Sequence, residues 1–106
     1  MDYYVEDTID LLKNVKNNPY GIKNRYHALE RAQKRSIDLN IVNTNICTGL
    51  LVGIEKSLNE TSIFQLLYEY SAKEDLCIVI NILNDEEIEI KTLIKKDINK
   101  RRHYAY

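Results

Sequence analysis

The apolar segment at residues 76–83, LCIVINIL, constrains the fold of this chain more than any other stretch. If it is helical, apolar side chains cover most of its circumference and leave only Cys77 and Asn81. A helix that is apolar on almost all sides must be buried, either at the centre of a domain or at an interface between subunits. The rest of the chain, or a second copy of it, therefore has to cover this segment.

Local signals favour helices along the chain. Ser71 and Glu74 have the spacing of a capping box ahead of a helix at 72–83, and NDEE at 84–87 is a similar cap signal ahead of a helix at 85–102. Other segments have apolar residues at helical spacing, which predicts helices at 2–15, 22–40, 43–59 and 61–70. In the first of these, Lys13 and Lys16 complement the negative end of the helix dipole.

These signals together predict an all-α fold. We expect one compact domain over residues 1–106 that forms a bundle of five or six helices, with a short basic tail from about residue 100 that frays. One proline and three glycines are too few for a sandwich or barrel with many tight turns.

The C-terminal half has an alternative interpretation. LCIVINIL and IEIKTLI also resemble two strands joined at NDEE, because Ile, Val and Thr favour strands and Ile88 and Ile90 alternate with acidic residues. This alternative predicts an α+β fold with a C-terminal hairpin at about 76–94. The two cap signals, and the basic end of the expected last helix, favour the helical interpretation.

One face of the expected helix at 22–40 is basic. Tyr26 and Leu29 fall on its core side, and the basic residues gather opposite or beside them: Lys23, His27, Arg31, Lys34 and Arg35. Such a face is either a solvated helix surface or a contact for nucleic acid or an acidic partner. The sequence pI of about 6.1 lies far below that of a dedicated nucleic-acid binder, which favours the solvated surface.

No motif in the sequence names a reaction, a cofactor or a metal. Three scattered glycines do not form a phosphate-binding loop. The two cysteines lie far apart in the sequence, and neither His27 nor His103 has zinc-ligand spacing relative to them. We therefore predict a protein that is not an enzyme, with no catalytic residue, no cofactor and no metal site.

Apolar surface in excess of what a small domain can cover predicts a homo-oligomer. Gly49 and Gly53 are four residues apart in the expected helix at 43–59, which suggests that a second helix approaches closely there. Ile78 and Ile82 lie in the apolar segment at 76–83. These four residues are the candidate subunit interface.

The N-terminal residues have no basic region followed by a long apolar run, so we expect no signal peptide and a cytoplasmic protein. No apolar run approaches the ~20 residues that span a bilayer, so we expect no membrane contact. The leading function is a small non-enzymatic interaction protein, such as a phage or mobile-element regulator or inhibitor, that binds a protein or a small ligand. The alternative is a nucleic-acid-binding regulator that uses the basic helix face.

Overall fold

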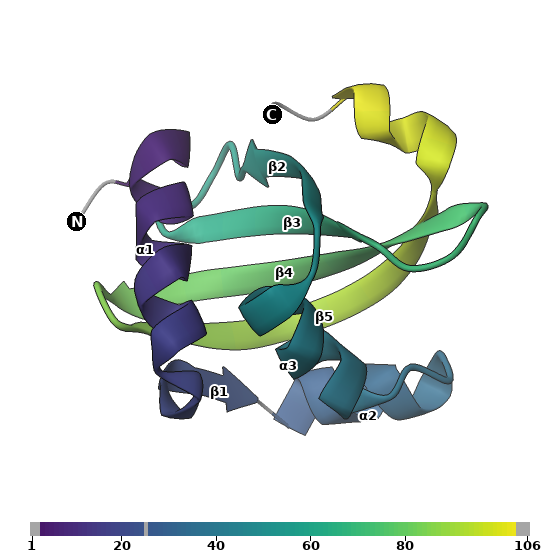
Figure 1. Cartoon of the computed structure of the whole chain (residues 1–106), viewed down its shortest axis with the longest axis horizontal. Coiled ribbons are helices and arrows are strands. Elements are labelled where there is room, and N and C mark those ends of the chain that lie inside the picture. The colour runs from purple at the N-terminus through teal and green to yellow at the C-terminus, as the bar shows by residue number, and fades with distance from the viewer. Residues whose placement is uncertain (1–2, 25, 104–106) are drawn as a thin grey trace.

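A single mixed sheet of five strands organises the chain, and the computed structural model describes residues 3–24 and 26–103. Helices α1 and α3 lie in front of the sheet, and α2 lies along the β5 side (Figure 1). In chain order, with η for a 3-10 helix, the elements are α1 (Val5–Asn17), η1 (Pro19–Gly21), β1 (Ile22–Asn24), α2 (Tyr26–Lys34), α3 (Leu39–Thr48), β2 (Leu51–Lys56), β3 (Ile63–Glu69), β4 (Glu74–Asn84), β5 (Glu87–Asp97) and η2 (Ile98–His103).

The strands lie in the order β1-β5-β4-β3-β2. Strands β2 to β5 form an antiparallel meander, in which each strand pairs with the next along the chain. Strand β1 comes from the N-terminal part of the chain and pairs with β5 in parallel, with Ile22 opposite Ile88. Of the helices in the described ranges, none is long and apolar enough to cross a membrane.

The prediction of an all-α bundle is wrong, because the fold is α+β. The segments expected as helices at 61–70, 72–83 and 85–102 contain β3, β4 and β5. In the sheet, Ile78 pairs with Leu66 on one side and Leu93 on the other. Two flanking strands thus cover the apolar segment at 76–83. The alternative interpretation, an α+β fold with a hairpin at about 76–94, predicted the fold class that the structure shows.

The two expected helix caps are strand-connecting turns. Ser71 Oγ accepts a hydrogen bond from the Glu74 amide at 3.1 Å, between β3 and β4. Asn84 Oδ1 accepts one from the Glu86 amide at 2.9 Å, between β4 and β5. Short polar side chains make the same bonds to nearby backbone in caps and in turns. The sequence spacing therefore cannot distinguish a helix start from a hairpin.

One side of the sheet and the buried sides of the helices form the core. Alternate residues of β3, β4 and β5 point to this side, as the two-residue period of a strand requires. From α1, buried side chains at helical spacing meet them. The core side of the strands includes Phe64, Leu66, Tyr68, Leu76, Ile78, Ile80, Ile82, Ile88, Ile90 and Leu93, and α1 adds Leu11, Leu12 and Val15.

The expected helix at 22–40 is interrupted twice. Residues 22–24 form β1, and α2 ends where Ser36 adopts a left-handed conformation with φ of 55°. The Ile37 amide then donates to the Ala32 carbonyl at 2.8 Å, which closes the helix end. Helix α3 starts afresh, with the Asp38 side chain accepting from the Asn40 amide at 2.9 Å.

The buried side of α2 also differs from the prediction. Tyr26 was assigned to the core side but is 79% exposed, and Leu29 is exposed as well. The buried residues are Ala28 and Ala32, whose small side chains allow α2 to pack close to β5. Near the start of the chain, the helix expected at 2–15 is present as α1.

Candidate functional site

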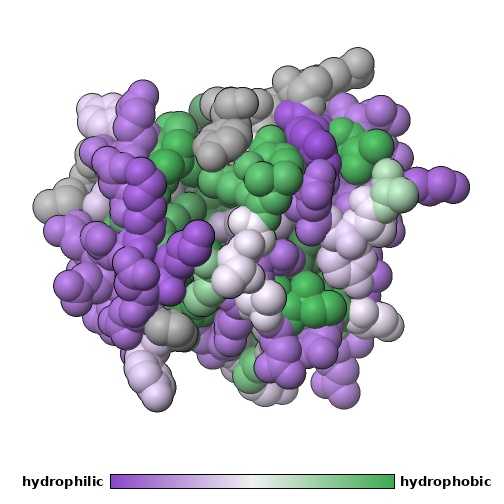
Figure 2. All heavy atoms as spheres, in the orientation of Figure 1, coloured by the Kyte–Doolittle hydropathy of each residue, from purple (hydrophilic) through white to green (hydrophobic). Residues whose placement is uncertain are grey.

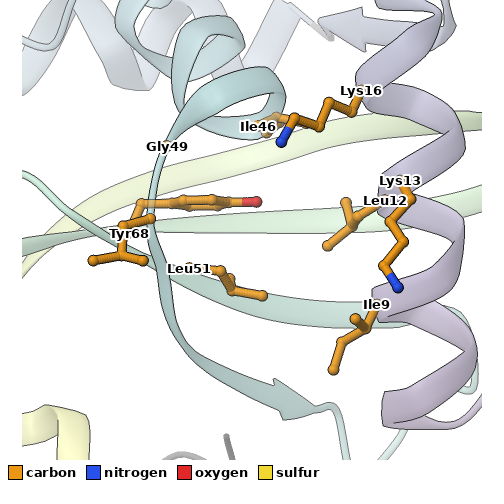
Figure 3. A pocket seen from close by; sticks show the side chains of 9 residues that line it. Ile9, Leu12, Lys13, Lys16, Ile46, Gly49, Leu51 and Tyr68 are labelled. Carbon is orange, nitrogen blue, oxygen red and sulfur yellow. The ribbon is translucent and has the colours of Figure 1, made fainter.

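A cleft of about 230 Å³ lies between α1, the end of α3, and strands β2 and β3. Figure 3 shows its apolar side chains converging from these four elements: Ile9, Leu12, Ile46, Leu51 and Tyr68. In Figure 2 the surface is hollowed beside the polar outer side of α1, with apolar residues next to the hollow. The cleft is thus open to solvent and partly apolar, and one small apolar group can pack against its side chains.

The exit of the chain from α3 shapes one wall of this cleft. The Gly49 amide donates to the Asn45 carbonyl at 2.8 Å, and a Cβ at Gly49 would lie 2.6 Å from that carbonyl oxygen. Only glycine therefore permits this tight passage from α3 into β2. Leu50, the next residue, also lines the cleft and is 61% exposed.

Two lysines line the cleft from α1. Lys13 and Lys16 are three residues apart, which places them on neighbouring positions of one helix face. In Figure 3, the Lys16 side chain reaches toward Ile46 on α3. Lys13 Nζ lies 3.5 Å from Asp10 Oδ1. Within the described part of the chain, Lys16 makes no ion pair.

The basic residues singled out from the sequence lie on β1, on α2 and just after α2, and they contact nearby groups. Lys23 Nζ lies 3.4 Å from Glu87 Oε2, and Lys34 Nζ lies 3.3 Å from Glu30 Oε1. Arg31 Nε donates to His27 Nε2 at 3.3 Å, and half-buried Arg35 donates to the Leu93 carbonyl on β5. Arg35 therefore joins the end of α2 to the sheet.

The carboxylate of Glu87 is held in its charged form. Asn84 Nδ2 donates to it at 2.7 Å, and this hydrogen bond is the main reason that the pKa of Glu87 lies below its ordinary value. The Lys23 ammonium lowers this pKa further. Part of the positive charge of Lys23 is thus neutralised within the chain.

The four residues of the candidate subunit interface do not share one surface. Ile78 is fully buried and Ile82 is buried beside it in the core. Gly53 is a buried residue of β2 opposite Leu67, and Gly49 ends α3. Contact through Ile78 would require exposure of the core.

One buried ion pair was not expected from the sequence. Arg101 donates to both carboxylate oxygens of Asp75, at 2.9 and 2.6 Å, and Asp75 is fully buried. This contact raises the pKa of Arg101 and joins η2 to β4. Across residues 3–24 and 26–103, no three His, Cys, Asp or Glu side chains gather as a metal site would need.

Comparison of the chain with models of known protein families, with curated proteins and with solved structures finds no match. The chemistry of the residues that line the cleft is therefore the evidence for its function. Sequence reasoning missed it because its residues come from four separate elements. The only signal available was the pair Lys13 and Lys16, which the helix dipole already explains.

Proposed function

We propose that this protein is a small non-enzymatic binding protein, and that the cleft between α1 and α3 takes one apolar group of a small ligand. The observation that carries the proposal is the cleft itself, with its apolar side chains at the surface. A volume of about 230 Å³ equals that of about eight water molecules at ~30 Å³ each. An alkyl chain of about six carbons, or one aromatic ring, fits this space.

The kinds of side chain at the cleft support a binding role. Among the described residues that line it, there is no histidine, thiol or carboxylate. Those groups carry most acid–base and nucleophilic catalysis. Burial of a six-carbon chain contributes about 5 kcal/mol at ~0.8 kcal/mol per methylene, before the cost of association. We therefore expect dissociation constants in the millimolar range or weaker for simple probes.

An NMR titration with 1-hexanol tests the proposal. We expect amide shifts that saturate and that map to α1, the end of α3, and β2. Leu51→Trp fills the cleft and should abolish these shifts, whereas Leu58→Trp should retain them, because Leu58 is 98% exposed in the loop between β2 and β3. Shifts that survive in a folded Leu51→Trp protein would contradict the proposal.

A second candidate function is binding of single-stranded nucleic acid, as the basic residues suggested. The observation that favours it is the exposure of two tyrosines, Tyr20 at 88% and Tyr26 at 79%, on either side of β1 with Lys23 between them in sequence. Exposed aromatic rings beside basic residues stack on bases and contact phosphates.

Fluorescence anisotropy with a labelled oligonucleotide at low and high salt tests this candidate. The triple change of Lys23, Arg31 and Lys34 to Glu, and separately Tyr26→Ala, should each weaken binding. The single change Lys91→Glu on β5 should weaken it less. Binding that survives the triple change would exclude this surface.

Self-association remains a proposal, as does binding of a protein partner. The core position of Ile78 and Ile82 moves any subunit interface to other residues. Light scattering tests the proposal directly. A mass of 12.5 kDa across the micromolar range would contradict a homo-oligomer.

A further inference from the structure

We infer that the ligand of the cleft carries a carboxylate, so that the preferred occupant is a small amphipathic monocarboxylic acid. This inference rests on the proposed function, and it adds the charge of the ligand. The described lining of the cleft contains two ammonium groups, those of Lys13 and Lys16, and no acidic side chain. A partly apolar cleft with only positively charged side chains at its edge complements an apolar chain with one negative end.

The two ammonium groups are available to a ligand. The ion pair between Lys13 and Asp10 spans 3.5 Å, and its side chains are 72% and 76% exposed. Pairs this exposed contribute little, so a carboxylate of the ligand can replace Asp10. Lys16 makes no ion pair with any other described residue.

The apolar and the basic side chains of the cleft contact different ends of such a ligand. Ile9 and Leu12 of α1, with Leu51 of β2, offer contact to an alkyl chain (Figure 3). Lys13 and Lys16 extend from the same helix with their ammonium groups pointing apart (Figure 3), so that a carboxylate can receive a charge-assisted hydrogen bond from one of them.

The lysines also have a structural role, and it must be distinguished from ligand binding. Lys16 lies in the last turn of α1, where a cation complements the helix dipole. That role acts on the stability of the helix. It does not change the relative affinity of the cleft for an acid and for the matching alcohol.

The experiment compares hexanoate with 1-hexanol by NMR titration at neutral pH, because the two probes share one chain length. We expect hexanoate to bind up to about fivefold more tightly, because ion pairs with exposed lysines contribute little. In the double variant Lys13→Gln and Lys16→Gln, this advantage should fall to about one. The matched control Lys91→Gln, an exposed lysine on β5, should keep the advantage.

The outcomes separate this inference from the proposed function. Equal binding of the two probes, or an advantage that survives in the double variant, overturns the carboxylate inference while hexanol binding upholds the cleft. Absence of binding by both probes overturns both. Lys13 and Lys16 are exposed, so the variants should fold, and the single variant Lys16→Gln provides a second measurement if the double variant does not.

Discussion

Glu87, the first residue of β5, has two partners from different parts of the chain. The Asn84 amide belongs to the preceding turn, and the Lys23 ammonium belongs to β1. Both favour the ionised carboxylate, so the folded protein lowers the pKa of Glu87 below its ordinary value of 4.5. A depressed folded pKa adds stability that is present above the unfolded pKa and is lost as the pH falls through the folded pKa.

We predict that Glu87→Gln lowers the urea midpoint slightly at pH 7 and that the difference disappears in acid. The change should shrink as the pH falls below about 4.5, because the wild-type carboxylate then takes up a proton. Urea unfolding at several pH values measures it. Glu86→Gln, at an exposed neighbour in the same turn, is the control and should leave the urea midpoint at pH 7 close to that of the wild type.

A substitution at Ile78 tests whether the apolar segment at 76–83 is part of the hydrophobic core. Ile78→Ala should lower the free energy of unfolding by about 3 kcal/mol, because it removes buried methyl groups and leaves a cavity. Ile94→Ala on β5, where the side chain is exposed, should cost less than about 1 kcal/mol. Chemical denaturation measures both. A smaller loss for Ile78 than for Ile94 would argue against the core position.

At the scale of elements, the end of α2 shows why the boundaries were hard to predict. The helix ends at Lys34, and Ser36, two residues later, has a positive φ of 55° and is not glycine. No proline or glycine between residues 22 and 40 marks this end. The left-handed conformation persists because the Ile37 amide bonds to Ala32 and because Ile37 is itself buried.

We predict that Ser36→Gly stabilises the protein by up to about 1 kcal/mol. Glycine has no Cβ and adopts a positive φ without strain, although it loses more conformational freedom on folding. Thermal and urea unfolding measure the gain. Ser36→Ala should give none, and a Ser36→Gly variant less stable than wild type would contradict the assigned helix end.

For the molecule as a whole, β4 is the centre of the sheet. It pairs with β3 along one side and with β5 along the other, whereas β1 has three residues and one partner. The stability of the backbone hydrogen bonds should follow this arrangement, since local openings start where few contacts hold an element.

We predict that amides at 76–82 in β4 exchange with solvent only through global unfolding. Amides of β1 at 22–24 should exchange faster, through local opening. Hydrogen exchange followed by NMR in low concentrations of urea measures this. Equal protection of β1 and β4 would show that the N-terminal strand belongs to the same cooperative unit.

The composition of each segment alone indicates which parts of the chain must be buried. Residues 76–83 require cover on most sides because their composition is apolar, and in the structure Leu76, Cys77, Ile78, Ile80 and Ile82 are buried, whereas Leu83 is 43% exposed. The helical spacing of apolar residues at 2–15 also predicted the helix that is present as α1, since residues one turn apart lie together whatever the rest of the chain does.

The choice between helix and strand in the second half of the chain depends on contacts between segments that are distant in sequence. The cleft depends on such contacts as well. The partners of β4 lie in β3 and β5, so hydrogen bonds to other segments determine its conformation. The signals around Ser71 and Asn84 serve caps and turns alike. The cleft brings together Leu12, Ile46 and Tyr68 from three distant segments. A local sequence pattern carries no information about how close such segments come in space.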